Sequence, residues 1–467
     1  MFIKQLYTGC LSEAAYYIES EGEAAIIDPL RDIDEYITLA KERNAGIKYI
    51  FETHFHADFV SGHLDLSKQT GAPIIYGPGA KTNFKVHNSK DGEIFKLGKI
   101  NFEVLHTPGH TLESACYLLK DENDKAHALF TGDTLFVGDV GRPDLSSGNM
   151  SSEELAGIMY DTIQNKILPL ADDVIVYPAH GAGSSCGKNL GPNTFSTIGE
   201  ERQTNYALQP QTKEEFIKVV TEGLAEAPKY FAINAKINMQ GYDSIEEVKQ
   251  KGLTPLSLDA FKKLMTEDVL ILDTRHADKF TEGFIPGSIF IGLEGRFAEW
   301  AGALLPFDKP MILVTEPGME EETVIRLSRV GFDKMLGYLQ GSFEGWSNAG
   351  EKVDMIINIE ADELAMDIPH DPNLVVVDVR RETEYADGHV KDAQNIPLNE
   401  MTDVAAIAAF EDSQNLYVHC AGGYRSVIAS SILKRQGIHN LRNVLGGWGK
   451  IKEEKNITVE KDTSVLN

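Results

Sequence analysis

Short apolar runs alternate with polar turns along the first half of the chain. Five of these runs predict buried strands, at 24–28, 47–53, 101–107, 128–133 and 173–177. Longer stretches with apolar residues at helical spacing predict helices over 151–167 and 213–226. A polar, glycine-containing passage over 240–254 is expected to be a linker. This alternation predicts an α/β domain in which several strands end in polar, chemically useful residues.

Beyond this passage the pattern is duplicated. Residues 270–275 (Leu-Ile-Leu-Asp-Thr-Arg) correspond to 375–380 (Val-Val-Val-Asp-Val-Arg), and 280–285 correspond to 385–390. A repeat of this length indicates a duplicated domain rather than a solenoid. Each copy has a strand–helix–strand rhythm with continuously apolar strands, which predicts a parallel sheet covered by helices.

Three features of the copies carry a family resemblance. They are the Asp-x-Arg strand end, a Gly-His-Val segment at 388–390 and a closing Gly-Gly-Trp at 446–448. Together they resemble rhodanese sulfurtransferase domains. The resemblance implies two rhodanese-like α/β domains with parallel sheets, which we place at 254–350 and 356–467.

The second copy carries a cysteine loop, Cys420-Ala-Gly-Gly-Tyr-Arg425, between an apolar strand and a predicted helix. A thiolate in such a loop meets backbone N–H groups and the positive end of the helix dipole, which stabilise it. Arg425 adds a positive charge for an anionic donor or acceptor. We therefore predict that Cys420 is a nucleophile that carries sulfur as a persulfide, and the loop resembles that of active rhodaneses.

The first copy has the same scaffold without a thiol. Where Cys420 falls in the second copy, residues 315–322 read Thr-Glu-Pro-Gly-Met-Glu-Glu-Glu. Four glutamates would repel an anionic donor. We expect this copy to be catalytically inactive and to serve as a spacer or docking surface.

Histidines and aspartates gather at the predicted strand ends of the first half. The segment 53–59 (Thr-His-Phe-His-Ala-Asp-Phe) has His54, His56 and Asp58 at alternate positions, which would share one face if the strand continued. Three more such residues follow other strands next to glycine or proline: His110, Asp133 and His180. Any one of them alone would suit an ordinary hydrogen-bonded role, but the whole set predicts a metal site.

The ordered set resembles the metallo-β-lactamase fold, an αββα sandwich, which we place at 1–243. Many members of that fold bind two metals and have a histidine ligand at the position of Phe59. Phenylalanine removes this ligand, which disfavours a two-metal hydrolase. Two imidazoles and a carboxylate on one face are typical of non-haem Fe(II) sites that bind O₂ and substrate together.

Within the fold, the pattern resembles the persulfide dioxygenase branch. That resemblance implies one Fe(II) per chain, with His54, His110 and Asp133 as ligands. His56 and Asp58 would then orient ligands and water from the second shell. The residues themselves leave open whether His56 is a ligand.

Two further segments favour this branch. The loop 138–144 resembles its Gly-x-Gly-Arg-x-Asp loop, and Arg142 either binds a substrate carboxylate or phosphate or braces the loop through Asp144. The Gly- and Ser-rich loop 179–188 carries Cys186, which we expect to be unburied and to meet incoming sulfane sulfur. Tyr177 and His180 are expected to position substrate or water. The remaining cysteines, Cys10 and Cys116, are predicted to lie in the core.

Composition limits the class of protein. The chain of 467 residues is too long for one core, and 42% hydrophobic with 25% charged residues is typical of soluble globular protein. A net charge of −27 argues against nucleic acid or anionic membrane as partner. The start lacks the pattern of a signal peptide, and the four cysteines lie far apart, so we expect no disulfides and a cytoplasmic location.

The two predicted chemistries fit one reaction. The resemblance implies that O₂ oxidises a low-molecular-weight thiol persulfide to sulfite, and that Cys420 transfers sulfane sulfur to sulfite, giving thiosulfate and detoxifying sulfide. A homo-oligomer is expected from the family's habit. One alternative is a glyoxalase II-type, metal-dependent thioester hydrolase. Another is a non-catalytic protein that carries persulfide through Cys186 and Cys420.

Overall fold

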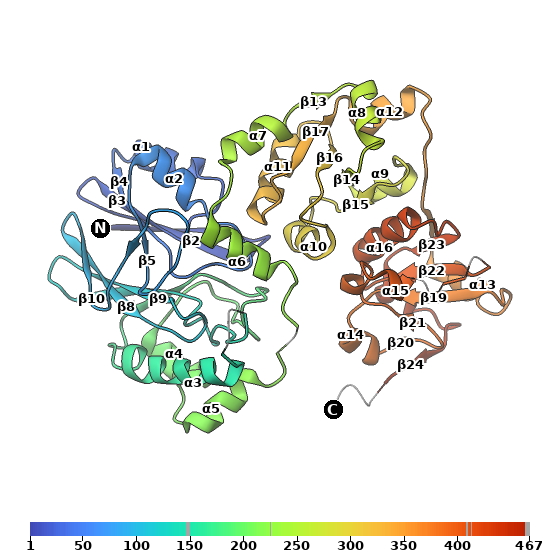
Figure 1. Ribbon diagram of the computed structural model, residues 1–467. Coiled ribbons are helices and arrows are strands. Elements are labelled where there is room, and N and C mark those ends of the chain that lie inside the picture. Colours follow the sequence, from blue (N-terminus) through green and yellow to red (C-terminus); the bar gives the residue numbers. More distant parts are fainter. Residues whose placement is uncertain (146–149, 225, 408–409, 412, 463–467) are drawn as a thin grey trace. The chain divides into compact units, whose positions relative to one another are not determined.

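The computed structural model describes residues 1–145, 150–224, 226–407, 410–411 and 413–462 (Figure 1). The chain forms two compact units: 1–247 with 325–333, and 248–324 with 334–467. Within the described residues, we find no helix with the length and apolar character that a bilayer crossing requires.

The first unit contains two six-stranded sheets. The first sheet has the order β1 (Phe2–Thr8), β2 (Glu13–Ser20), β3 (Glu23–Ile27), β4 (Gly46–Phe51), β5 (Ile74–Tyr76) and β6 (His87–Asn88). The second has the order β12 (Ser196–Thr197), β11 (Ile175–Pro178), β10 (Ala126–Gly132), β9 (Ala115–Lys120), β8 (Ile100–His106) and β7 (Ile94–Leu97). Both sheets mix parallel and antiparallel pairs.

Apolar side chains from both sheets form a shared core between them. The ring of Phe51 on β4 lies 5.1 Å from that of Phe102 on β8 and 4.6 Å from that of Tyr117 on β9. Helices α1 (Asp34–Glu42) and α2 (His63–Thr70) pack on the outer face of the first sheet. The outer face of the second sheet is covered by α3 (Ser152–Thr162), α4 (Ile198–Thr204) and α5 (Lys213–Thr221). These four layers confirm the predicted αββα sandwich.

The predicted elements of this unit have close counterparts. The five predicted strands correspond to β3, β4, β8, β10 and β11. The helix predicted over 151–167 is α3, which begins with a capping box between Ser151 and Glu154 and continues as a π-helical turn, Ile163–Ile167. A short 3₁₀ turn (Tyr206–Leu208) precedes α5.

The passage 240–254, expected to be a linker, contains the boundary between the two compact units, at 247/248, and it also forms a helix. Helix α6 (Phe231–Gln240) ends where the passage begins, and α7 (Ile245–Gly252) lies within it. Ile245 and Val248, three residues apart, are both buried, so the segment does have one apolar helical face. Its many charged residues obscured that face in the sequence.

The second unit contains two five-stranded sheets in which every strand pair within a sheet is parallel. One has the order β13 (Pro255–Leu256), β17 (Met335–Leu339), β16 (Met311–Val314), β14 (Leu270–Asp273) and β15 (Ile289–Phe290). The other has the order β18 (Ile357–Ile359), β23 (Leu441–Val444), β22 (Asn415–His419), β19 (Leu374–Asp378) and β21 (Gln394–Asn395). The identical topology confirms the predicted duplication.

Helices surround both sheets. The first copy has α8 (Leu258–Met265), α9 (Ala277–Glu282), α10 (Phe297–Leu304), α11 (Glu320–Arg329) and α12 (Ser342–Asn348). The second has α13 (Ala361–Asp367), α14 (Glu382–Ala386), a 3₁₀ turn (Leu398–Glu400), α15 (Val404–Ile407), α16 (Tyr424–Arg435) and α17 (Gly447–Ile451). A small antiparallel ribbon joins β20 (His389–Val390) to β24 (Val459–Glu460).

The repeated Asp-x-Arg motif has the same structural role in both copies. Arg275 pairs with Asp273 at 2.7 Å and donates to the carbonyl of Gly283 at 2.9 Å, all out of contact with solvent. Arg380 pairs with Asp378 in the same way in the second copy. The motif therefore fastens the loop after each strand rather than performing chemistry.

Candidate metal centre and sulfur-transfer loop

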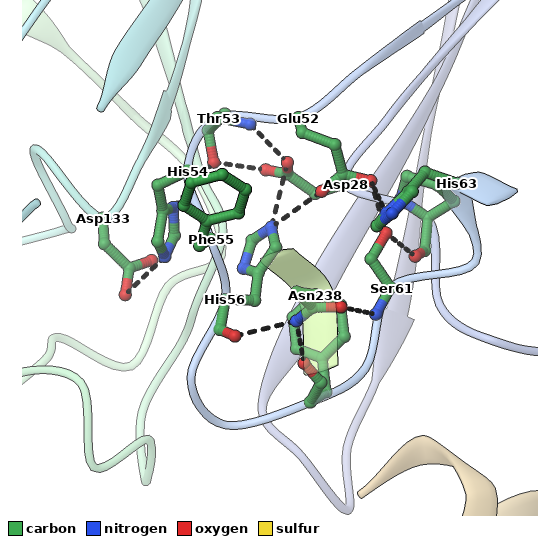
Figure 2. A network of polar contacts seen from close by, with 12 residues as sticks. Asp28, Glu52, Thr53, His54, Phe55, His56, Ser61, His63, Asp133 and Asn238 are labelled. Carbon is green, nitrogen blue, oxygen red and sulfur yellow. Dashed lines mark hydrogen bonds and ion pairs between the residues drawn. The ribbon is translucent and has the colours of Figure 1, made fainter. Parts of the chain in front are cut away.

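The segment 53–59 is a loop, so the prediction that its alternate residues share one strand face is wrong. Strand β4 ends at Phe51 because Asp28, at the end of neighbouring β3, captures the next backbone. The N–H and hydroxyl of Thr53 donate to the Asp28 carboxylate at 2.7 and 2.8 Å. The loop nevertheless directs His54 toward Asp133, as Figure 2 shows.

His54, His110 and Asp133 meet in one buried cluster, and one potential ligand atom from each lies within 4.8 Å of the others. The Nε2 atoms of His54 and His110 lie 3.8 and 3.5 Å from Oδ2 of Asp133. His110 follows β8 and Asp133 follows β10, so three strand ends supply the site. Neither oxygen of Asp133 has a hydrogen-bond partner among the described residues, which leaves a buried carboxylate with full capacity for a cation.

The hydrogen bonds fix which ring nitrogens face the cluster. The hydroxyl of Thr53 donates to Asp28, so it accepts from Nδ1 of His54 at 3.0 Å. Nδ1 of His110 donates to the backbone carbonyl of Arg142 at 2.8 Å. The nitrogen of each ring that faces Asp133 is therefore Nε2.

Electrostatics favour the neutral form of His54. Burial, followed by the neighbouring His56 and His110, holds the pKa of His54 well below its usual value of 6.5, so the ring is neutral. Two imidazoles and a carboxylate fit a divalent transition metal. This donor set suits Fe(II), and it also occurs in zinc sites.

A second buried group lies beside the first and consists of His56, Asp58 and His180. Nε2 of His180 is 3.4 Å from Asp58 and 3.5 Å from Asp133, while its Nδ1 donates to a backbone carbonyl of Ser12 at 3.2 Å. Burial raises the pKa of Asp58. His180 and Asp58 thus border the space next to the three-residue cluster.

Nε2 of His56 lies 3.0 Å from Asp28 and 3.5 Å from Glu52. Burial disfavours the charged ring, but Asp28 and Glu52 outweigh it and raise the pKa of His56 well above its usual value. A ring that favours protonation competes poorly for a metal. The arrangement supports a second-shell role for His56, which stays a prediction.

The surroundings of Arg142 support the bracing alternative. The buried guanidinium forms two bonds to Asp144, at 2.7 and 2.8 Å, and contacts the carbonyl of Ser185 at 3.3 Å. Its backbone N–H donates to the carbonyl of Cys186 at 2.9 Å. Arg142 therefore ties the loop after Asp133 to the loop that carries Cys186.

The prediction that Cys186 is unburied is wrong, because this fastened loop folds inward and leaves the residue only 1% exposed. Its sulfur and the ligand atoms of Asp133 and His180 all lie within 4.8 Å of one another. Burial, together with Asp58 and Asp133, raises the pKa of the Cys186 thiol well above its ordinary value. Cys186 is thus part of the centre, as a neutral thiol.

The other predicted residues vary in their placement. Tyr177 stacks on Phe130 in the sheet core, with ring centroids 5.4 Å apart, which gives no support to a substrate contact. Cys116 is buried as predicted, but Cys10 is only partly buried. Asp28 and Glu52, whose carboxylates lie beside His56, were not among the predicted site residues. Their positions at the ends of β3 and β4 were the available signal.

In the second copy, Cys420 follows β22 and is 2% exposed. The N–H of Gly423 donates to its sulfur at 3.1 Å, and Gly423 caps α16 with φ of +107°, a conformation that favours glycine. Arg425 forms two bonds to Glu384, both 2.8 Å, and this pairing lowers the pKa of Glu384. The cysteine therefore lies in the predicted loop before a helix. The guanidinium of Arg425 is paired with Glu384, so its charge is not fully available to an anionic donor or acceptor.

Comparisons with known proteins agree with this architecture. A family model described as the metallo-β-lactamase superfamily matches residues 8–180, and a rhodanese-like domain model matches 257–349 and 360–454. A hydroxyacylglutathione hydrolase, GloC, from Haemophilus influenzae is 31% identical over 42% of this chain and 91% of that protein. The human mitochondrial persulfide dioxygenase ETHE1 is 29% identical over 47% of this chain and 79% of that protein.

A crystal structure of a metallo-β-lactamase from Staphylococcus aureus is similar over a larger part of the chain. It matches with a TM-score of 0.65 and 35% identity, and covers 73% of this chain and 99% of that one. The chain therefore belongs to the metallo-β-lactamase superfamily, with a metallo-β-lactamase domain followed by two rhodanese-like domains.

Proposed function

We propose that this chain is a non-haem Fe(II) persulfide dioxygenase whose product is used by its own rhodanese domain. The observation that carries the proposal is the three-donor cluster of His54, His110 and Asp133 beside Phe59, whose ring packs on His56 at 4.3 Å. A second metal at this side lacks the ligand that a histidine would supply. The similarity to a persulfide dioxygenase supports the same choice.

In this scheme His54, His110 and Asp133 would hold one Fe(II), which supplies the redox chemistry that activates O₂ toward sulfur. His180 and Asp58 would position the water that releases sulfite, because they border the cluster on one side. Arg142 keeps the two surrounding loops together. The oxidation balances as RSSH + O₂ + H₂O → RSH + SO₃²⁻ + 2 H⁺.

The sulfur transfer would use Cys420. Its thiolate attacks the outer sulfur of a second persulfide, the S–S bond breaks, and the carrier leaves as a thiol. Sulfite then attacks the sulfane sulfur on Cys420, which releases thiosulfate and restores the thiolate. The Gly423 N–H and the N-terminus of α16 stabilise the sulfur anion between these steps. Cys186 would serve as a second sulfur acceptor next to the iron: its thiol would attack the outer sulfur of the persulfide, the S–S bond would break, and its proton would pass to the carrier, which leaves as a thiol.

One other function has a specific observation in its favour. The similarity to hydroxyacylglutathione hydrolases supports a metal-dependent thioester hydrolase, and the donor set also accepts zinc. That reaction requires no oxygen. It also leaves the Cys420 loop without a part in the chemistry.

The two functions differ in products. With glutathione persulfide as the probe, we expect O₂ uptake and thiosulfate formation, with one O₂ consumed for each thiosulfate. Hydrolysis of an S-(hydroxyacyl)glutathione thioester by the same preparation, without O₂ uptake from the persulfide, would support the hydrolase instead. A bound persulfide that never turns over would indicate a carrier.

A further inference from the structure

A second polar array lies behind the metal centre, on the side away from Asp133 (Figure 2). It contains Asp28, Glu52, His56, Ser61 and His63, and none is more than 1% exposed. Buried ionisable groups are costly unless they are closely paired. So many buried ionisable groups beside the metal centre indicate a role beyond stabilising the fold.

Glu52 is the hub of the array. One carboxylate oxygen accepts from the hydroxyl of Ser61 and lies 3.2 Å from Nδ1 of His63. The other oxygen lies 3.5 Å from Nε2 of His56. Glu52 precedes the loop 53–59, and His63 follows it. The Glu52 carboxylate therefore connects the two ends of this loop with His56 in its middle.

The loop backbone has a separate anchor in Asn238 of α6. Its amide nitrogen donates to the carbonyls of His56 and Phe59, both at 2.8 Å, and its amide oxygen accepts from the N–H of Ser61 at 2.9 Å. Asn238 alone can therefore hold the path of the chain. What it does not hold is the orientation of the His56 ring.

That orientation comes from the carboxylates and from the rings around them. Asp28 and Glu52 both face Nε2 of His56, and the Phe59 ring stacks on the His56 ring at 30°. Glu52 in turn lies 3.2 Å from Nδ1 of His63, an ion-pair contact rather than a hydrogen bond, and the His63 ring stacks on Phe84 at 5.2 Å. The centroid of the His56 ring lies 4.2 Å from that of the His54 ring, so the His56 ring limits how far the His54 ring can rotate.

We propose that Glu52 and His63 are positioning residues that fix the His56 ring and, through it, the direction in which His54 presents its Nε2 to the metal. The inference rests on the metal centre of the proposed function. It adds two residues to that centre that touch neither metal nor substrate. Groups that hydrogen-bond directly to a metal-binding residue are worth about 10–100-fold in metal affinity. Glu52 and His63 act one contact further from the metal, so we expect the lower end of that range.

Two variants test this: Glu52→Gln, which keeps size and can still accept from Ser61, and His63→Phe, which keeps the ring packing. Tyr76→Phe is the matched control. Tyr76 is fully buried, its ring contacts that of His63 at 6.0 Å, and its hydroxyl has no hydrogen-bond partner among the described residues. Circular dichroism selects the variants that fold. If His63→Phe does not fold, Glu52→Gln carries the test.

The first readout is Co(II) binding, followed by its visible absorption, because it requires no assumption about the reaction. We expect Co(II) to bind both variants about tenfold more weakly, with a shifted absorption band, and Tyr76→Phe to match the unmodified chain. EPR of the Fe(II) protein treated with nitric oxide should show altered line shape in the same two variants. Weaker folding with unchanged spectra and affinities would overturn the proposal.

The test separates this inference from the proposed function. Oxygen uptake by the unmodified chain reports on the function alone. If the Co(II) spectrum of Glu52→Gln is altered but the unmodified chain takes up no oxygen, the positioning role is supported and the dioxygenase function is contradicted. If the unmodified chain takes up oxygen but the Co(II) spectrum of Glu52→Gln is unchanged, the dioxygenase function is supported and the positioning role is contradicted.

Discussion

The ring of Phe59 stacks on that of His56, with 4.3 Å between centroids and 30° between planes. Both are fully buried. Phe59 thus covers the ring of the second histidine in the loop with an apolar surface. Among the buried groups of potential ligands in the described residues, His54, His110 and Asp133 form the one that the proposed iron would use.

Phe59→His should restore the missing ligand. With Asp58, Asp133 and His180 nearby, we expect zinc content to rise from one toward two per chain, and oxygen uptake to fall because the space beside the cluster becomes occupied. Elemental analysis after zinc reconstitution measures the first effect. A variant that still binds a single zinc would contradict this account of Phe59.

His110→Ala should separate the two activities. Loss of one of three ligands should remove nearly all oxygen uptake, while thiosulfate:cyanide sulfur transfer at Cys420 continues at its usual rate. An oxygen electrode and a thiocyanate assay check the two halves. Loss of both activities in a well-folded variant would argue against independent sites.

Cys420→Ser should give the converse result. Oxygen uptake should persist, sulfite should accumulate in place of thiosulfate, and sulfur transfer to cyanide should disappear, because the persulfide carrier is gone. Cys116→Ser is the control for sulfur transfer, since Cys116 is buried in the first unit against Thr107 and the carbonyl of Thr131, and burial raises its pKa to about 11. If Cys420→Ser forms thiosulfate at an undiminished rate, another residue carries the sulfur and the role assigned to Cys420 is wrong.

Arg142 and Asp144 offer a matched pair of variants. If Arg142 braces the loops, Arg142→Gln and Asp144→Asn break the same two bonds and should lower oxygen uptake to a similar extent, within about threefold. If Arg142 instead binds substrate, only Arg142→Gln should raise the KM for the persulfide. Steady-state oxygen uptake distinguishes the two.

The pair of Arg425 and Glu384 predicts a pH effect on stability. The folded pKa of Glu384 lies below the usual 4.5, so its stabilising contribution is present above that pH and is lost as the pH falls through the folded pKa. The pair is partly exposed and screened, so we expect Glu384→Gln to cost about 0.5–1 kcal/mol at pH 7. Urea unfolding at pH 7 and 4 should show this difference shrinking, and a constant difference would contradict the pairing.

Much of the fold was predictable because it depends on local patterns. Continuous apolar runs gave the parallel strands of both repeats, and Gly423 with the following helix gave the Cys420 loop. The helix α7 was missed because Ile245 and Val248 are its only deeply buried apolar residues in a charged stretch. Periodicity is weak evidence for so short a helix.

The metal site was predictable as a set of residues but not as a geometry. The convergence of His54 with Asp133 depends on Asp28, which ends β4 from a different strand. The burial of Cys186 depends on the backbone bond from Arg142, across more than forty residues. Glu52 and His63 meet only because the loop between them closes. Such contacts are set by tertiary packing and leave no local pattern.

The central claim is that this centre binds one iron and uses oxygen. The most direct measurement is elemental analysis of the purified chain, combined with oxygen uptake on glutathione persulfide by the same sample. The account predicts one iron per chain and uptake proportional to iron content. Zinc in its place, with no uptake after iron reconstitution, would contradict it.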